Sequence, residues 1–545
     1  MLRHRLSPLF GLGALLAALA PFAAPAATYT VGPSGRQYTQ LTTLMSSVDL
    51  APGDIVLVDG DATYNGGIVV GDDDSGSSAS PVTIRWTRAS GETRPLLQGG
   101  SSTIKFEQSH FVTLEGFDIT GGSFACVFNE ANGTIVRDVL VRDCPSHGIL
   151  GADQNSGSFT LEYSEVRRSG SGTTRHSMYM QNDEVLYPNA VFRMRYNYVH
   201  DGNGGILMRT RYSRSEIYYN WFESSTNEEV EFIGPDCEAQ KASWTPDLVR
   251  EDTDFVGNVI VHTSAWRNAI RTGGDLVGRN QGRVRLVNNT IIFDRPGIAN
   301  AVRVQLGTES VEMHNNVVHQ TGSSVPNVVE ENYDVATPYC APFDTDPWSS
   351  GRKVAGSNNW VKSGSNMVPP EWTATRSGID PGFENLAIRS LRPTAGSPLV
   401  DGGNSQPQTP VAFPFPSPLL VPAFDPPLRV KPGLNGRSQR TIVGARIDIG
   451  ALEQAGSGAI PRNGSRPLLP PRPTLPPTGS GAAVVPEPVS IRPSHLAPAE
   501  RAGTTASGRT GFRPSPWLGT LMAWPLPGFL WVGFPALMFW LRALF

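Results

Sequence analysis

Two short runs of this chain contain the side chains best suited to acid–base chemistry on a charged ligand. The first reads HSMYM at residues 176–180, and the second reads GILMRTR at residues 205–211. Strand alternation separates each run into two faces. One face receives Met178, Met180, Ile206 and Met208, and the other receives Ser177, Tyr179, Leu207, Arg209 and Arg211. The first face is predicted to be core, and the second presents a hydroxyl, a phenol and guanidinium groups.

A repeat organises the chain around these runs. A polar or small residue followed by apolar residues recurs at Gly116, Asp138, Ser164, Asn197, Asn220, Asn258, Asn289, Asn316 and Asn359. The intervals through Asn316 range from 22 to 38 residues, which is the pattern of a solenoid with loops of unequal length. Because the shortest interval holds short strands and no helix, we predict an all-β fold, a right-handed parallel β-helix. Asn suits a fixed turn position, since it tolerates left-handed backbone geometry and its amide can bond the next coil about 4.8 Å away.

Aligning the strand after each repeat position predicts which side chains form rows along the solenoid. The inward row is Met178, Ile206, Val230, Ile270 and Val302. The first outward row is Tyr179, Leu207, Glu231, Arg271 and Arg303, and beside it lie Gln181, Arg209, Ile233, Gly273 and Gln305. Ser177, Gly205 and Glu229 follow on the other side. A slip of two residues in any coil would change the rows but not the face.

Such a face suits an elongated glycan, because the spacing of coils, about 4.8 Å, is close to the rise of one sugar residue. On a uronate polymer, β-elimination needs a cation for the carboxylate, a base for the proton at C5 and an acid for the leaving oxygen. We assign Arg209, Arg211 and Arg271 as neutralisers and His176 or Tyr179 as base or acid, with His200 and His262 in reserve. Glu229, Glu231, Arg271, Arg303 and Gln305 are predicted to contact substrate.

Each of these residues also has a structural interpretation. His176 shares parity with Met178, so it can be a hydrogen-bonded histidine at the mouth of the core. The two arginines can be solvated charges, and Glu229 with Glu231 can form an ion-pair network with Arg209 and Arg271. Three rival functions follow: a hydrolase built on Glu229, Glu231 and Asp201, a C5-epimerase in the same groove, or a non-catalytic envelope or adhesion protein that binds glycan.

The spacing of His-x-x-Tyr and, about thirty residues later, Arg-x-Arg resembles bacterial β-helix proteins grouped with polysaccharide lyases. The run LMRTRYSRSEIYYNWF also resembles the arginine-bearing coil of the chondroitinase B and alginate lyase family. That family's pattern implies an arginine at Arg209 and an Asn-x-Phe at residues 220–222. The chain departs from it in one respect. The family's base is a lysine on a neighbouring coil, and no lysine lies between Lys105 and Lys241.

The ends of the chain predict export. Residues 1–26 have a basic start, an apolar core and an Ala-Pro-Ala cleavage signal, as in a secretory signal peptide. The β-helix domain is predicted to span 27–454, with a capping helix around residues 39–46. A disordered, proline-rich linker is expected over 455–515. The uncharged segment 516–541 is long enough to cross a bilayer, so we expect a hydrophobic membrane anchor.

Composition limits the partners. A net charge of −4 and a pI near 6.2 provide no broad basic field for nucleic acid, so a polyanionic ligand would have to be met by a local patch of arginines. We expect an anionic polysaccharide as ligand and a monomeric protein. The four cysteines of an exported chain permit two disulfides, and we pair Cys126 with Cys144 and Cys237 with Cys340. No CxxC or HExxH pattern occurs, so no metal cofactor is predicted. The acidic turn at residues 72–74 leaves a calcium ion as an alternative.

Overall fold

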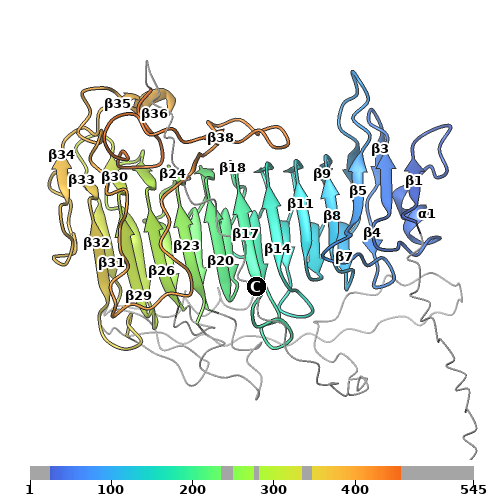
Figure 1. Cartoon of the computed structure of the whole chain (residues 1–545), viewed down its shortest axis with the longest axis horizontal. Coiled ribbons are helices and arrows are strands. Elements are labelled where there is room, and N and C mark those ends of the chain that lie inside the picture. The colour runs from blue at the N-terminus through green and yellow to red at the C-terminus, as the bar shows by residue number, and fades with distance from the viewer. Residues whose placement is uncertain (1–24, 235–249, 275–281, 334–345, 456–545) are drawn as a thin grey trace, which may run out of the picture. The chain divides into compact units, whose positions relative to one another are not determined.

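The computed structural model describes residues 25–234, 250–274, 282–333 and 346–455. The chain divides into two units, residues 1–468 and residues 469–545. The second unit lies outside the residues that the structure describes. Within the described part of the first unit, three long sheets run side by side and every neighbouring pair of their strands is parallel (Figure 1).

Sheet A has twelve strands within the described ranges. In order they are β1 (Thr28–Val31), β2 (Ile55–Val58), β5 (Val82–Trp86), β8 (Val112–Glu115), β11 (Thr134–Arg137), β14 (Phe159–Glu162), β17 (Val191–Arg195), β20 (Arg214–Tyr218), β23 (Asp252–Val256), β26 (Arg283–Val287), β29 (Ser310–His314) and β32 (Val354–Ser357).

Sheet B has twelve strands in the same part of the chain. They are β3 (Thr63–Asn65), β6 (Leu96–Gln98), β9 (Asp118–Thr120), β12 (Leu140–Arg142), β15 (Glu165–Arg167), β18 (Tyr198–His200), β21 (Trp221–Glu223), β24 (Val259–His262), β27 (Thr290–Phe293), β30 (Val317–Gln320), β33 (Trp360–Lys362) and β34 (Arg376–Gly378).

Sheet C has ten strands among the described residues. They are β4 (Ile68–Val70), β7 (Ser102–Glu107), β10 (Ala125–Glu130), β13 (His147–Gly151), β16 (Met178–Gln181), β19 (Met208–Arg211), β22 (Val230–Ile233), β25 (Asn268–Gly273), β28 (Asn300–Gln305) and β31 (Asn327–Glu331).

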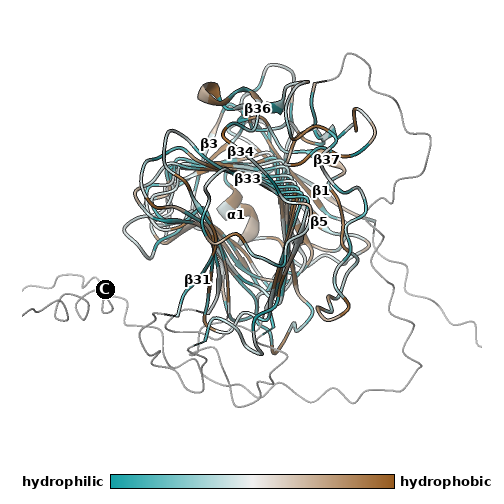
Figure 2. Cartoon of the chain, turned by 90° about the vertical axis from the view of Figure 1, so that its left-hand side faces the viewer, coloured by the Kyte–Doolittle hydropathy of each residue, from teal (hydrophilic) through white to brown (hydrophobic). Residues whose placement is uncertain are grey.

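Consecutive strands of one coil belong to three different sheets, so each coil closes a three-sided turn around a common core (Figure 2). Parallel connections of this kind are right-handed. The predicted right-handed parallel β-helix is confirmed. One inward residue from every strand of sheet C fills the core, and each of these side chains is at most 4% exposed. They are Ile68, Ile104, Val127, Ile149, Met178, Met208, Val230, Ile270, Val302 and Val329.

The N-terminal end of this core is closed by the short helix α1 (Leu41–Met45), which lies within the segment predicted to be helical. Leu41 and Leu44 of the helix are fully buried and belong to the main hydrophobic cluster. Figure 2 shows the helix in projection within the ring formed by the three sheets. Capping the open end of a solenoid covers apolar side chains that no further coil would cover.

The predicted asparagine ladder is present and fully buried. The amide Nδ2 of Asn197 donates to Oδ1 of Asn220 at 3.0 Å, and the same contact recurs from Asn220 to Asn258, Asn289, Asn316 and Asn359. Each ladder oxygen also accepts the backbone N–H of the preceding member, as between Asn220 N and Asn258 Oδ1 at 2.8 Å. Every amide is therefore satisfied within a dry corner between sheets A and B.

Two parts of the ladder prediction were wrong by one residue. Gly116 and Asp138 do not occupy the ladder position, because Val139 pairs with Ser164 there. They lie in the preceding row, whose backbone is left-handed. That row is Gly116, Asp138, Tyr163, Tyr196, Tyr219, Gly257, Asn288, Asn315 and Asn358. The residue with left-handed geometry is therefore the one before each ladder asparagine. The side chain of that preceding residue faces outward, whereas the asparagine side chain is buried.

A C-terminal segment, residues 379–455, packs against this outward row and against sheet B. It contains the antiparallel pairs β35 (Phe383–Asn385) with β36 (Ser390–Pro393) and β37 (Phe424–Asp425) with β38 (Ser438–Gln439), and the short helix η2 (Leu386–Ile388). Phe424 packs against the stacked rings of Tyr196 and Tyr219, 5.6 Å from each centroid.

The segment also covers apolar side chains of sheet B. Leu391, Ala451 and Leu452 bury Tyr198, Trp221, Val259, Val261 and Ile292, while Leu399 and Ile449 bury Val317 and Trp360. On the preceding strands the same outward row reads Leu96, Asp118, Leu140 and Glu165, in which apolar and acidic residues alternate.

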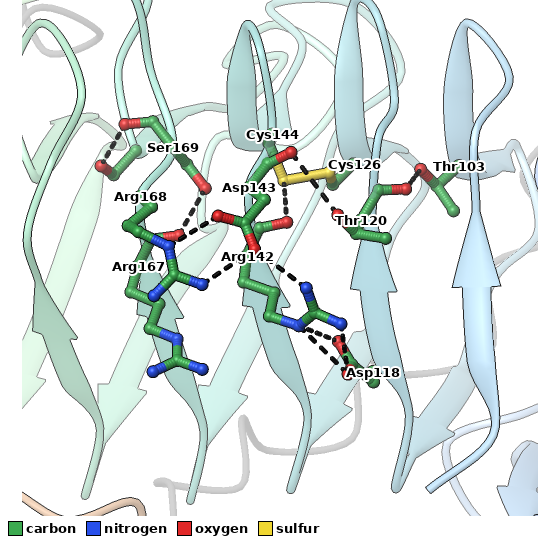
Figure 3. Close-up of a disulfide and its surroundings, with 11 residues drawn as sticks. Thr103, Asp118, Thr120, Cys126, Arg142, Asp143, Cys144, Arg167, Arg168 and Ser169 are labelled. Atoms are coloured by element: carbon green, nitrogen blue, oxygen red, sulfur yellow. Dashed lines mark hydrogen bonds and ion pairs between the residues drawn. A yellow bond between two sulfur atoms is a disulfide. The ribbon is translucent and has the colours of Figure 1, made fainter. Parts of the chain in front are cut away.

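The N-terminal part of sheet B instead carries ion pairs (Figure 3). Arg142 bonds Asp118 on the preceding coil at 3.0 Å and Asp143 at 2.9 Å, and Arg168 on the next coil bonds Asp143 at 2.6 Å. Beneath them the predicted disulfide between Cys126 and Cys144 is present, with Cα atoms 5.9 Å apart. It joins β10 of sheet C to the residues that follow β12 of sheet B.

Several predictions fall on residues that the structure does not describe. The signal peptide at 1–26 lies almost wholly outside the described residues, as do the linker at 455–515, the anchor at 516–541 and the pairing of Cys237 with Cys340. Among the residues that are described, no helix has the length and apolar character needed to span a bilayer.

Candidate functional site

The outer face of sheet C carries one continuous row of side chains, one from each of its ten described strands. In order along the cylinder these are Val69, Lys105, Phe128, Leu150, Tyr179, Arg209, Glu231, Arg271, Arg303 and Glu330. Parallel neighbours in a sheet are about 4.8 Å apart. The row therefore places a phenol, three guanidiniums and two carboxylates in line over five strand spacings. We call the part from Tyr179 to Glu330 the charged row.

The register predicted for this face was correct except on β19. Tyr179 pairs with Arg209 rather than with Leu207, and Gln181 pairs with Arg211 rather than with Arg209. The inward position belongs to Met208 and not to Ile206, and Leu207 replaces Gly205 in the third row. The slip has a local cause. Gly205 adopts a left-handed φ of 58° and Ile206 N–H is bonded to a histidine, so the turn uses two residues that the pattern assigned to the strand.

Glu231 bridges two arginines at the centre of the charged row. Its carboxylate pairs with Arg209 on the preceding strand, Nε to Oε2 at 3.2 Å, and with Arg271 on the following strand. The Glu231 side chain is 1% exposed, whereas those of Arg209 and Arg271 are 14% and 19% exposed. The carboxylate thus holds two guanidiniums in place from below, and the predicted ion-pair network is confirmed for this glutamate.

Tyr179 and Arg211 form the end of the charged row nearest the N-terminus. Arg211 Nε donates to the phenol oxygen of Tyr179 at 2.9 Å, and its Nη1 donates to the carbonyl of Gly234. The guanidinium carbons of Arg209 and Arg211 lie 5.3 Å and 5.8 Å from the Tyr179 ring centroid. Two cations beside one phenol stabilise negative charge on its oxygen. The sequence-predicted pair Tyr179 and Arg209 is therefore brought together.

His176 lies next to this pair but is buried, with 1% of its surface exposed. Its Nδ1 accepts the backbone N–H of Ile206 at 3.0 Å, which places the single proton of the neutral ring on Nε2. Burial and the neighbouring arginines hold the pKa of His176 well below its usual range. Its Nε2 lies 3.3 Å from Arg209 Nη1. A neutral ring whose Nδ1 lone pair is already bonded is poorly suited to accept a proton from substrate, and its Nε2–H cannot accept a hydrogen bond from Arg209, which is itself a donor.

His147 repeats this arrangement one coil earlier. Its Nδ1 accepts the backbone N–H of His176 at 3.2 Å, and burial lowers the pKa of His147 to about 4. Its ring lies 5.9 Å from that of His176 and 6.1 Å from that of Tyr179. The two histidines form a small ladder at the start of sheet C, and the sequence identified only one of them.

Glu229 does not reach the outer face. Its side chain is fully buried, and its Oε2 bonds Nδ1 of His262, also fully buried, at 2.6 Å. Nε2 of this histidine contacts the carbonyl of Trp266 at 2.8 Å. Glu229 raises the pKa of His262 against the effect of burial, while burial raises the pKa of Glu229, so the two groups form an internal hydrogen-bonded pair. The substrate contact predicted for Glu229 and the reserve catalytic role of His262 do not fit this placement.

Arg303 and Gln305 lie at the C-terminal end of the charged row. Arg303 pairs with Glu330 at 3.2 Å, and 26% of the Arg303 side chain is exposed. Gln305 is 6% exposed and donates to the carbonyl of Gly274 at 3.1 Å. Arg303 therefore remains a candidate contact for a ligand, while Gln305 is engaged in a bond between coils.

His200 and Asp201 belong to a different face. His200 ends β18 of sheet B, where Nδ1 contacts Asp201 at 2.8 Å and Nε2 contacts Glu165 at 3.2 Å. The three carboxylates considered for hydrolysis are thus separated, since Glu229 is interior, Glu231 is on sheet C and Asp201 follows sheet B. No pair of them flanks one position on a surface.

The acidic turn at residues 72–74 has a structural role at Asp74. This residue is 1% exposed and accepts the backbone N–H groups of Leu50 and Gly71, both at 3.0 Å. Within the described ranges, no group of three or more His, Cys, Asp or Glu residues is arranged to hold a metal ion.

Sequence reasoning missed the N-terminal half of the row, namely Val69, Lys105, Phe128 and Leu150, and also Glu330. The alternation in TIKFE and CVFNE is the signal that could have found Lys105 and Phe128. Lys105 lies in the same row as Arg209 but four strands away, a distance of about 19 Å. It is therefore too far from Arg209 to take the place of the lysine base that the chondroitinase B and alginate lyase family has on a neighbouring coil.

Comparisons with known proteins find only distant similarity to solved structures. No protein-family profile and no curated protein sequence matches the chain. Among solved structures, the pectate lyase Pel9A is 12% identical with a TM-score of 0.42 and covers 79% of this chain and 97% of its own. An alginate lyase from Paenibacillus sp. str. FPU-7 is 13% identical with a TM-score of 0.33, covering 56% and 98%. A lacto-N-biosidase from Eubacterium ramulus is 10% identical with a TM-score of 0.32, covering 65% and 68%. Similarity at this level carries no assignment of chemistry.

The charged row itself suits an anionic ligand. The row holds three arginines (Arg209, Arg271 and Arg303) and two glutamates (Glu231 and Glu330). With Arg211 of the adjacent row, these described residues give a local excess of two positive charges. The partly buried guanidiniums lie in a line on a flat parallel sheet. A carboxylate-bearing chain laid along the sheet would meet guanidiniums on β19, β25 and β28, with Glu231 of β22 between the first two.

Proposed function

We propose that this protein is an exported, monomeric β-helix protein that binds an acidic, uronate-containing polysaccharide along sheet C and cleaves it by β-elimination. The observation that carries the proposal is the placement of Tyr179, Arg209 and Arg271 in one row around a buried carboxylate. Residues 1–26 support export, and the apolar stretch 516–541 supports attachment to a membrane.

In this mechanism, Arg209 and Arg271 bind the uronate carboxylate and stabilise the negative charge that develops as the proton at C5 is removed. Glu231 keeps the two guanidiniums in position, since it already pairs with both. Because Glu231 is almost fully buried beneath them, substrate meets the cations and not the carboxylate.

Tyr179 is the proposed proton acceptor. Its oxygen accepts a bond from Arg211, and two guanidiniums beside the ring favour its deprotonated form. The phenolate takes the C5 proton, the electron pair of that C–H bond becomes the double bond between C4 and C5, and the C4–O bond breaks. The leaving oxygen takes a proton, which the newly formed phenol supplies when the two groups lie on one face of the sugar. His176, which is buried and neutral, takes no part in proton transfer in this account.

Turnover on a panel of polyuronates tests the proposal. Alginate, pectate, glycosaminoglycans and uronate-bearing bacterial exopolysaccharides are each incubated with the full chain, and the ultraviolet absorbance of the unsaturated uronate is followed. We expect a rise on at least one polymer and its loss in Arg271→Ala. No rise on any of them would overturn the lyase, while reducing ends without unsaturation would indicate a hydrolase and altered uronate stereochemistry an epimerase. Glycan binding without any turnover would indicate a non-catalytic envelope protein.

A further inference from the structure

The N-terminal half of the row on sheet C is an apolar strip next to the charged row. Phe124, which precedes β10, is 41% exposed, and Val69 of β4 is 43% exposed. Phe124 and Phe128 meet edge to face with their ring centroids 5.4 Å apart. Leu150 lies between Phe128 and Tyr179 in the row. An exposed group of apolar side chains on a soluble domain marks a surface that binds something.

This strip is continuous with the charged row. Phe128 pairs with Leu150, Leu150 with Tyr179, and Tyr179 with Arg209, so three strand spacings separate Phe128 from Arg209. At about 4.8 Å for each spacing, the distance is about 14 Å. That is close to the length of three sugar residues in an extended chain. A ligand held at Arg209 and lying along the row would therefore cover the phenylalanines.

Lys105 lies in the row between Val69 and Phe128 and brings two carboxylates to the strip. Lys105 pairs with Glu107 at 2.9 Å and with Glu130 at 2.8 Å, and its Nζ lies 5.3 Å from the Phe128 ring centroid. Glu107 is about half exposed. A pyranose ring has an apolar face of C–H groups and a rim of hydroxyls, so it matches an aromatic surface with charged hydrogen-bonding groups at its edge.

We infer that Phe124 and Phe128 form a stacking subsite for the sugar unit about three positions from the unit bound at Arg209. This inference rests on the proposed function, because the charged row defines where the chain is anchored. The subsite recognises the apolar face of a pyranose and requires no carboxylate on that unit. It therefore accepts a neutral sugar of an acidic heteropolysaccharide as readily as a uronate.

A length series of oligosaccharides tests the subsite. Oligogalacturonates and oligoalginates from disaccharide to octasaccharide are titrated calorimetrically and assayed for turnover, using the full chain, Phe124→Ala with Phe128→Ala, and Phe128→Trp. Ile379→Ala is the matched control, since this residue is 79% exposed and follows β34 of sheet B. Circular dichroism verifies that each variant is folded.

We expect the double variant to weaken binding roughly threefold to tenfold for each lost ring, only for chains of four units or more. This loss persists at high salt, because stacking is not screened, whereas the loss in Arg271→Ala decreases with salt. Phe128→Trp retains long-chain affinity. An equal loss for short and long chains, or no loss, would overturn the subsite even if the parent cleaves polyuronates. Binding that depends on the phenylalanines without any cleavage would keep the subsite and overturn the lyase.

Discussion

The outer faces of sheets B and C are built by the same coils, yet they are used differently. On sheet B, the C-terminal segment covers a group of apolar outward residues, namely Tyr198, Trp221, Val259, Val261, Ile292, Val317 and Trp360. On sheet C, the outward residues of the same coils are Tyr179, Arg209, Glu231, Arg271 and Arg303, and their guanidiniums are partly exposed. In both sheets the outward side chains form rows with the same spacing, which is the distance between neighbouring parallel strands. What differs is the chemistry of the outward residues: on one face they pack against another segment of the chain, and on the other they form the partly exposed row that we propose binds a ligand.

The largest expected effect concerns the covered face. Trp221 is fully buried between sheet B and Leu391, Ala451 and Leu452. Trp221→Ala should lower the free energy of unfolding by about 3–5 kcal/mol, because the cavity lies between two packed layers. Phe128→Ala, which changes an outward aromatic residue of sheet C, is the matched control and should cost distinctly less. Urea unfolding followed by circular dichroism measures both, and equal losses would contradict the difference between the faces.

The corner shared by sheets A and B should respond next. In Asn258→Ala, the buried N–H of Asn220 loses its acceptor and the carbonyl of Ile217 loses its donor. Two unsatisfied buried groups should cost about 2–4 kcal/mol of stability. Asn203→Ala, at an exposed position, is the control and should change little. A ladder variant as stable as this control would show that the stacked amides contribute nothing.

Acid should destabilise both faces through buried histidines. Burial lowers the pKa of His147 on sheet C and of His319 on sheet B to about 4 from the model-compound value of 6.5. As the pH falls, the unfolded chain protonates these histidines at a higher pH than the folded chain does. Their contribution to the free energy of unfolding is therefore fully present above pH 6.5 and is lost as the pH decreases from 6.5 to 4. Each histidine should contribute up to about 3 kcal/mol of this loss. His147→Gln and His319→Gln should each flatten the profile of unfolding free energy against pH, and an unchanged slope in both would refute the assignment.

The smallest effect on stability is expected at the end of the charged row. Arg303 pairs with Glu330 at a partly exposed site, so Arg303→Ala should change stability by less than about 1 kcal/mol. It should nevertheless weaken binding of an anionic glycan, and the weakening should decrease with added salt. Arg168→Ala removes an equally paired arginine of sheet B and serves as the control. If both variants bind glycan equally, the charged row has no special role.

The fold could be predicted because the spacing of Asn197, Asn220, Asn258, Asn289, Asn316 and Asn359 reports a contact made once in every coil. The outward parity of Tyr179, Glu231, Arg271 and Arg303 followed from strand alternation. The register of β19 could not be predicted, since Ile206 and Met208 have equal parity and a turn decides which one begins the strand.

Other features depend on contacts that leave no local pattern. The pairing of Glu229 with His262 joins two coils across 33 residues, and nothing near either residue marks the pair as internal. Trp221 has the parity of an outward residue, and only a segment some 170 to 230 residues later explains its burial. Local alternation gives the face of a side chain but not what covers that face.

The most direct test of the central claim is the kinetics of Tyr179→Phe on the polyuronate that the parent cleaves. This variant keeps the ring beside Arg209 and removes the oxygen that accepts the bond from Arg211. If Tyr179 transfers the proton, kcat should fall by about 10²–10⁴-fold while KM changes little. An unchanged kcat would show that the row on sheet C binds the chain without carrying out the reaction.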